Sequence, residues 1–314
     1  MTTSVLVVGC GAIGGLFTSA LAEVAKVTVY DINRDHVDAI NRDGLKVSGE
    51  RPRTVHVAAT ADPAALRGQD FSTILFLCKS KATKEALASV LPQLSGQPLL
   101  VTMQNGMGNA EILLTAPDTP VARGPTMCAG RYVGPGHVEV LRQDTTWLGP
   151  VRGGVNDITA FAALLNTAGM PTELLADPMG AVWSKFVFNC VMNPLGALMM
   201  GDNSARYHVP EMCALIDDMA AECIAVVTGL GGDFAFPPMD YVAKTRSGVV
   251  PLSRHGGSMA LDIGRGAETE IDELTGFIVR EGDRLGLPVP NCRAVMRLVK
   301  GLELASQHRV AKPR

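Results

Sequence analysis

The first half of the chain alternates short apolar runs with segments in which apolar residues recur at a helical period. A run such as SVLVVG at residues 4–9 is rich in β-branched residues and is typical of a buried parallel strand. Strands that alternate with helices indicate a parallel sheet covered on both faces. The pattern predicts strands over residues 4–9, 26–31, 71–79 and 98–106, and helices over residues 12–25 and 82–91.

The pattern changes in the second half of the chain. Residues 137–149 resemble a β-hairpin with turn residues in its middle, and a helix and a short strand follow over residues 155–175. Beyond Asp177, long helical periods continue nearly to the end of the sequence. We therefore predict an α/β domain over residues 1–176 and an all-helical domain over residues 177–314.

Composition and charge restrict the classes of protein to consider. A chain of 314 residues with 47% apolar and 19% charged residues suits a globular protein of two domains. The net charge of −3 gives no basic surface for nucleic acid, and no run reaches the ~18 apolar residues of a membrane helix. Seven scattered cysteines without a C-x-x-C pair are typical of reduced thiols, and the six histidines show no metal-ligand spacing. We expect a cytoplasmic protein without metal, membrane or nucleic-acid partners.

The joint between the first predicted strand and the first predicted helix carries the motif G-x-G-x-x-G. In this setting Gly9 permits a tight turn, Gly11 lets the backbone approach a pyrophosphate, and Gly14 lets the helix pack on the strand. The N-terminus of the helix then faces the phosphates. The motif predicts a Rossmann-type dinucleotide-binding domain over residues 1–176. The predicted loop residues are Gly9, Cys10, Gly11, Ala12, Ile13 and Gly14.

Asp31 ends the second predicted strand, about 20 residues after the motif begins. A carboxylate at this place bonds the adenine ribose hydroxyls and repels a 2′-phosphate. Arg34, three residues later, could still reach such a phosphate. We therefore predict an NAD(P)H-dependent protein in which NADH is favoured over NADPH.

Residues 183–193, WSKFVFNCVMN, carry three polar residues in an otherwise apolar stretch. Lys185, Asn189 and Asn193 recur every four residues, so they lie along one face of a helix. A helix that is apolar on its other faces is usually buried, and a buried polar group without a partner costs ~1–3 kcal/mol. The row therefore either lines a ligand site or forms a narrow solvated stripe.

Several segments resemble the ketopantoate reductase family, nearly from one end of the chain to the other. The combination of K-x-x-x-N-x-x-x-N at residues 185–193 with T-E-I-D at residues 269–272 is more particular than the glycine motif. The matching segments are GCGAIG (9–14), LCKSK (77–81), QNGMGN (104–109), TMCAGR (126–131), WSKFVFNCVMNPLGALM (183–199), GGSMALDI (256–263) and ETEIDELTGFIVREGDRLGLPVPN (268–291), together with Asn203.

The resemblance implies an oxidoreductase that reduces a small 2-keto acid to its (R)-2-hydroxy acid, and 2-dehydropantoate to pantoate is the reaction that it favours. When hydride reaches the keto carbon, negative charge grows on the carbonyl oxygen and must be stabilised and protonated. An ammonium group on a rigid helix can do both. Lys185, which matches the lysine of the family, is therefore the predicted general acid.

The resemblance also implies further site residues. Glu270 matches a family glutamate near the nicotinamide ribose, and it could also keep Lys185 protonated. The predicted substrate-binding residues are Asn105, Asn189, Asn193, Asn203 and Ser258. The predicted cofactor-binding residues, besides the glycine motif and Asp31, are Lys79, Asn105, Gly130 and Glu270. We expect a homodimer joined through the helical domain.

One position departs from the family pattern, because His255 stands where an asparagine is usual. Together with Asp31, this residue leaves open an NAD-dependent D-2-hydroxyacid dehydrogenase that acts on a bulkier acid such as mandelate. A non-catalytic nucleotide-sensing protein of the same fold is a further alternative. The intact row that begins at Lys185 argues against it.

Overall fold

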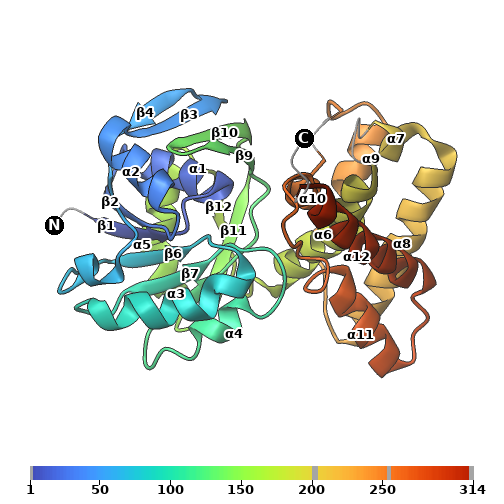
Figure 1. Ribbon diagram of the computed structural model, residues 1–314. Coiled ribbons are helices and arrows are strands. Elements are labelled where there is room, and N and C mark those ends of the chain that lie inside the picture. The colour runs from blue at the N-terminus through green and yellow to red at the C-terminus, as the bar shows by residue number, and fades with distance from the viewer. Residues whose placement is uncertain (1–2, 200–203, 253–255, 311–314) are drawn as a thin grey trace. The chain divides into compact units, whose positions relative to one another are not determined.

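The computed structural model describes residues 3–199, 204–252 and 256–310, so the predicted site residues Asn203 and His255 lie outside the described ranges. The chain divides into two compact units, Met1–Pro178 and Met179–Arg314. Figure 1 shows strands and helices in the first unit and helices in the second. This is the predicted fold class, an α/β unit followed by a helical one.

The main sheet of the first unit has eight strands among the described residues, in the order β12-β11-β8-β7-β6-β1-β2-β5. Its neighbouring strands are parallel except for β11 and β8, which are antiparallel. The strands are β1 (Ser4–Val8), β2 (Lys26–Tyr30), β5 (Ala58–Thr60), β6 (Thr73–Phe76), β7 (Leu99–Thr102), β8 (Val121–Arg123), β11 (Thr146–Arg152) and β12 (Thr172–Leu174).

Helices cover both faces of this sheet, and each face has its own apolar core. In β1, Val5 and Val7 face a core shared with α1 and α5, while Leu6 and Val8 face a core shared with α3 and α4. A central strand that is buried on both faces must be apolar at every position, which explains the continuous run in the sequence. The helices of the unit are α1 (Ala12–Leu21), α2 (Arg34–Asp43), α3 (Thr83–Val90), α4 (Asn109–Leu113) and α5 (Val155–Thr167), with short 3-10 turns η1 (Pro63–Leu66), η2 (Ser80–Ala82) and η3 (Leu91–Gln93).

Helix α1 is shorter than predicted, because it ends at Leu21 and not at residue 25. Lys26 pairs with Ser4 at the start of β1 and β2, so the chain must return to the sheet by that residue. The N–H groups of Val24 and Ala25 both bond to the carbonyl oxygen of Leu21, which closes a tight turn. The pairing of two strands therefore overrides the local helical pattern.

A smaller sheet of four described strands has the order β4-β3-β10-β9. Its strands are β3 (Leu45–Gly49), β4 (Arg53–Val55), β9 (Ala129–Gly134) and β10 (His137–Arg142). The predicted hairpin over residues 137–149 is wrong: residues 137–142 pair with β9 and β3, and residues 146–152 form β11 in the main sheet. The hairpin turn lies instead at Pro135-Gly136, where Gly136 has a φ of +69°.

The second unit consists, in its described part, of helices around the long helix that carries the polar row. They are α6 (Met179–Met199), α7 (Ala205–His208), α8 (Pro210–Gly229), α9 (Asp240–Arg246), α10 (Ser258–Gly264), α11 (Thr275–Leu285) and α12 (Pro290–Val310). Trp183 and Phe186 of α6 pack against Phe277 of α11, at 6.2 and 5.3 Å between ring centroids. Among the described residues, no helix has the length and apolar character needed to cross a membrane.

Candidate nucleotide and substrate sites

The three glycines of the loop between β1 and α1 differ in their surroundings. Gly9 has a φ of +89°, and a Cβ there would lie 2.5 Å from the backbone nitrogen of Cys78. A Cβ at Gly14 would lie 1.9 Å from the carbonyl oxygen of Gly9, whereas a Cβ at Gly11 meets no described atom within 4 Å. Gly9 and Gly14 are therefore fixed by packing, and Gly11 borders open space at the N-terminus of α1.

Asp31 follows β2 directly, and its carboxylate bonds the glycine loop. Its Oδ2 accepts a hydrogen bond of 2.7 Å from the N–H of Cys10, and its Oδ1 accepts one of 2.9 Å from the N–H of Asn33. Both oxygens are thus oriented by backbone groups. Burial raises the pKa of the Cys10 thiol to about 12, so this loop residue adds no negative charge near a phosphate.

Lys79 and Asn105 follow the neighbouring parallel strands β6 and β7. The hydroxyl of Ser80 donates to the carbonyl oxygen of Asn105 at 3.2 Å, and the side-chain amide of Asn109 donates to the same oxygen at 3.0 Å. The two segments are therefore joined at the carboxyl ends of their strands. Ligands bind at this edge in open parallel sheets.

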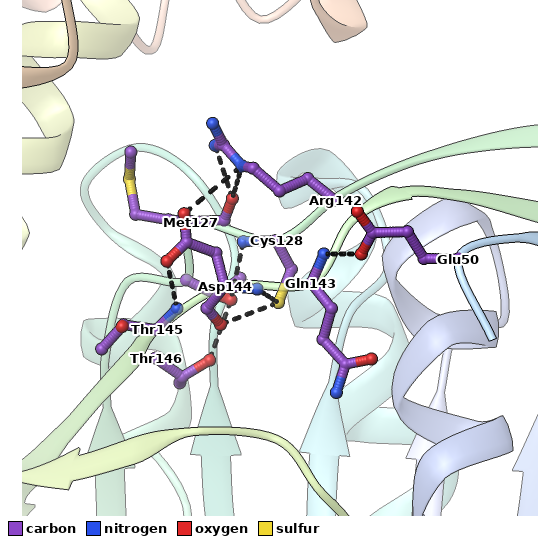
Figure 2. Close-up of polar contacts among 9 residues, drawn as sticks. Glu50, Met127, Cys128, Arg142, Gln143, Asp144, Thr145 and Thr146 are labelled. Carbon is purple, nitrogen blue, oxygen red and sulfur yellow. Dashed lines mark hydrogen bonds and ion pairs between the residues drawn. The ribbon is translucent and has the colours of Figure 1, made fainter. Parts of the chain in front are cut away.

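Gly130 of β9 lies against the beginning of α1, because a Cβ there would lie 3.2 Å from the carbonyl oxygen of Ala12. Figure 2 shows how the segment before it is held. Arg142 donates from Nε and Nη2 to the carbonyl oxygen of Met127, at 3.0 and 2.6 Å. The hydroxyl of Thr146 donates to that of Thr126 at 2.8 Å. The crossover from the main sheet to the small one thereby fixes Gly130 beside the glycine loop.

In the helical unit, α6 places Lys185, Asn189 and Asn193 along one face. The residues Asn189 and Asn193 are only 3% and 8% exposed, and Lys185 is half-buried with its Nζ 4.8 Å from the centroid of the Phe188 ring. A Cβ on Gly257, the residue before Ser258, would lie 3.2 Å from Oδ1 of Asn193. The structure thus brings Asn193 close to the start of α10, where Ser258 lies.

The segment that carries Glu270 is fixed on both sides. The hydroxyl of Thr275 donates to the carbonyl oxygen of Cys190 in α6 at 2.8 Å. The N–H and hydroxyl of Thr269 donate to Oε1 of Glu303 in α12, at 2.8 and 2.6 Å. Glu303 is 6% exposed, and its Oε2 lies 3.0 Å from Nζ of Lys300.

Lys300 completes this arrangement, which we call the α12 clamp (Thr269, Asp272, Lys300 and Glu303). Its Nζ also lies 2.9 Å from Oδ2 of Asp272. Hydrogen bonds to Asp272 and Glu303 raise the pKa of Lys300 above its usual value, so the ammonium stays charged. The clamp binds the turn on both sides of Glu270 to α12.

Sequence reasoning missed the residues that hold these segments in place. These residues make their contacts with partners far away in the sequence. In the clamp, Lys300 pairs with Asp272 and Glu303 accepts from Thr269. In the first unit, His36 bonds Cys10 of the glycine loop. The spacing from Lys300 to Glu303 would suit an exposed ion pair on a helix, so it gives no signal for a buried carboxylate. His36 has no motif around it.

Comparisons with known proteins cover both units. The family model described as ketopantoate reductase PanE/ApbA matches residues 5–153, and the model of its C-terminal part matches residues 177–303. The 2-dehydropantoate 2-reductase of Pyrococcus abyssi is 29% identical over 301 residues, which cover 95% of this chain and 97% of the relative.

Solved structures agree along the whole chain. The PanE/ApbA family ketopantoate reductase from Ralstonia eutropha JMP134 has a TM-score of 0.86 and 31% identity, with 98% of this chain and 100% of that chain covered. A D-mandelate dehydrogenase solved with NADH and anilino(oxo)acetate has the same TM-score of 0.86 at 20% identity, with 97% and 99% covered. The second likeness concerns the fold alone.

Proposed function

The chain belongs to the ketopantoate reductase family, and we propose that it reduces 2-dehydropantoate to pantoate with NADH or NADPH. It is an NAD(P)-dependent oxidoreductase that acts on a CH–OH group. The observation that carries the proposal is the row of Lys185, Asn189 and Asn193 along α6, in a chain whose other unit has the dinucleotide-binding loop. The mandelate-type alternative is not favoured, because the likeness to D-mandelate dehydrogenase is at 20% identity.

Lys185 acts as the general acid of this reaction. The bound nicotinamide supplies the hydride. The ammonium group of Lys185 stabilises the negative charge that develops on the carbonyl oxygen and then protonates it. The Nζ of Lys185 lies 4.8 Å from the centroid of the Phe188 ring, whose partly negative face attracts an ammonium group.

The amide side chains bind the rest of the substrate. Asn189 and Asn193 hold the carboxylate and hydroxyl ends, and Ser258 and Asn203 add contacts. An amide binds a carboxylate without adding a charge next to Lys185, so the lysine remains the charged group that polarises the substrate carbonyl. Asn105 contacts nicotinamide and substrate, and Glu270 contacts the nicotinamide ribose.

We propose that NADH is preferred over NADPH. Both carboxylate oxygens of Asp31 are oriented by backbone N–H groups at 2.7 and 2.9 Å, which supports a fixed negative charge where the adenine ribose binds. A fixed carboxylate repels a 2′-phosphate more effectively than a mobile one. Gly130 and Lys79 complete the cofactor site in this proposal.

We also propose a cytoplasmic homodimer that associates through the helical unit. The seven cysteines are free thiols, which supports a reducing compartment. Leu298 and Leu304 of α12 are each 59% exposed, so this helix offers apolar side chains for contact with a second copy. Sedimentation equilibrium of the purified chain tests the dimer, and a monomer at all concentrations would contradict it.

A panel of keto acids tests the function directly. The purified protein is assayed by oxidation of NADH and, separately, of NADPH, with 2-dehydropantoate and with phenylglyoxylate. We expect a higher kcat/KM for 2-dehydropantoate. A preference for phenylglyoxylate supports the mandelate-type alternative, whereas NADH binding without turnover of any keto acid supports a nucleotide sensor.

A further inference from the structure

His36 lies in the first turn of α2, buried behind the glycine loop. The residue is 1% exposed, and neither the glycine motif nor the proposed reaction uses it. Its Nε2 lies 2.8 Å from the carbonyl oxygen of Cys10, and its Nδ1 lies 2.8 Å from the backbone nitrogen of Gly136. The imidazole therefore connects the nucleotide loop with the turn of the β9–β10 hairpin.

The chemistry of its partners fixes the tautomer of His36. A backbone N–H can only donate, so the N–H of Gly136 donates to Nδ1 of the ring. A backbone carbonyl can only accept, so Nε2 carries the proton and donates it to Cys10. Both ring nitrogens of His36 are thus used in hydrogen bonds to the backbone.

This bond sets the orientation of one peptide plane. The carbonyl of Cys10 and the N–H of Gly11 belong to the same peptide, and the described chain has no cis peptide bonds. In a trans peptide the C=O and N–H point in opposite directions. Since the carbonyl points at His36, the N–H of Gly11 points away from it. A Cβ on Gly11 would meet no described atom within 4 Å, so there is also open space beside this residue.

The preceding peptide is fixed as well, because the N–H of Cys10 donates to Asp31 at 2.7 Å. The loop therefore has two supports on the two sides of Cys10: Asp31 through the N–H and His36 through the carbonyl. A backbone N–H at the N-terminus of a helix binds an anion best when it is oriented before the anion arrives.

The ring itself is held from the small sheet. Tyr132 of β9 packs edge-on against His36, with 5.2 Å between ring centroids and 67° between ring planes. The side-chain amide nitrogen of Asn33 lies 3.4 Å from the hydroxyl of Tyr132, and Oδ1 of Asn33 accepts from the backbone N–H of His36 at 3.2 Å. Tyr132 and Gly136 thus contact the imidazole itself, while Asn33 holds the backbone of His36.

We propose that His36 is a positioning residue for the cofactor: it fixes the Cys10–Gly11 peptide so that the N–H of Gly11 faces the diphosphate of the dinucleotide. The inference rests on the proposed dinucleotide binding. It adds a specific side chain, outside the glycine motif, that determines how well the loop binds a diphosphate.

Two variants of similar volume test this role. His36→Leu fills the space but can bond neither Cys10 nor Gly136, whereas His36→Gln offers a donor and an acceptor on one planar group. His137→Ala is the control, because His137 bonds Ser48 at 2.8 Å within the same small sheet and does not bond the loop. For each protein, NADH affinity is titrated by fluorescence, thermal unfolding is recorded, and kcat and the KM for NADH are measured with 2-dehydropantoate.

We expect His36→Leu to raise the Kd and KM for NADH about tenfold with kcat at saturating NADH nearly unchanged, since a loop hydrogen bond of ~1–1.5 kcal/mol is lost. His36→Gln should recover most of the affinity, and His137→Ala should bind NADH like the unmodified protein. An equal Kd for the Leu and Gln variants, both folded, overturns the role of His36. An equal loss in His137→Ala also overturns it, because the effect would then belong to the small sheet. Failure of the unmodified protein to bind NADH contradicts the proposed function itself.

Discussion

The proposed nucleotide loop would act through the backbone of one short stretch, whereas the proposed substrate site would act through side chains from several separated segments. Gly9, Gly11 and Gly14 lie within six consecutive residues, and what matters there is where N–H groups point and how closely atoms pack. In the helical unit, the proposed site residues stand on α6, at the start of α10 and in the segment of Glu270.

This difference predicts different responses to substitution. A site made of backbone groups depends on conformation, so changes in the glycine loop should alter cofactor affinity and leave the chemical step intact. A site made of side chains depends on the group at each position, so changes in the row should alter turnover or substrate affinity. Measuring both the Kd for NADH and kcat therefore distinguishes the effects of substitutions in the two regions.

Replacing the general acid should have the largest effect. Lys185→Ala should lower kcat by about 10²–10⁴, because the charge that grows on the carbonyl oxygen loses both its electrostatic partner and its proton donor. The Kd for NADH should stay nearly unchanged. Asn189→Ala and Asn193→Ala are the matched variants on the same face, and they should raise the KM for the keto acid more than Lys185→Ala does. A near-normal kcat for Lys185→Ala would contradict this mechanism and would show that the row serves only the packing of the helix.

The glycines of the loop should differ among themselves. Gly14→Ala places a Cβ 1.9 Å from the carbonyl oxygen of Gly9, so the helix must shift and NADH affinity should fall about 10–100-fold with a lower Tm. Gly11 has a φ of −67°, which alanine adopts easily, so Gly11→Ala should keep its Tm and lose affinity only through the methyl group that faces the ligand. NADH titration and thermal unfolding of both variants make the comparison. A normal Tm for Gly14→Ala would contradict the packing argument.

Local pattern was sufficient to predict most of the first unit. Residues 5–8 of β1 are a continuous apolar run because both faces of the strand are buried, and the glycine loop follows from residues 9–14 alone. The hairpin at 137–149 failed for the opposite reason. Its first half pairs with β9 and with β3, which lies far earlier in the chain, and no property of residues 137–142 specifies that partner.

The supports of the two sites were not predictable for the same physical reason. The bond from His36 to Cys10 spans 26 residues, and the bonds from Thr269 to Glu303 span 34 residues. Such contacts depend on which helices meet in the folded chain, whereas the row at 185, 189 and 193 depends only on the period of one helix. Local spacing therefore predicts which side chains share one helix face, whereas the residues that support a segment depend on the tertiary fold.

The α12 clamp supports the segment that carries Glu270, a side chain of the proposed site, just as His36 supports the backbone of the glycine loop. Glu303→Ala removes the acceptor of two hydrogen bonds from Thr269, so Glu270 should lose its fixed position and kcat should fall about tenfold. Glu303→Gln keeps an acceptor for Thr269 and should recover part of the loss. Asp217→Ala, which breaks an exposed pair with Arg246 in the same unit, is the control and should retain kcat. If Glu303→Ala lowers the Tm and leaves kcat unchanged, the clamp is only structural.

Cofactor choice should give the smallest effect, because it depends on a charge that water partly screens. Asp31→Ser removes the carboxylate that both Cys10 and Asn33 orient, so the ratio of kcat/KM for NADH to that for NADPH should fall about fivefold. Asp35→Ser removes an exposed acid from the first turn of α2 and serves as the matched control, for which the ratio should not change. Initial rates with each cofactor at a fixed concentration of 2-dehydropantoate give the ratios. If the unmodified protein prefers NADPH tenfold, Arg34, and not Asp31, dominates the recognition of the ribose.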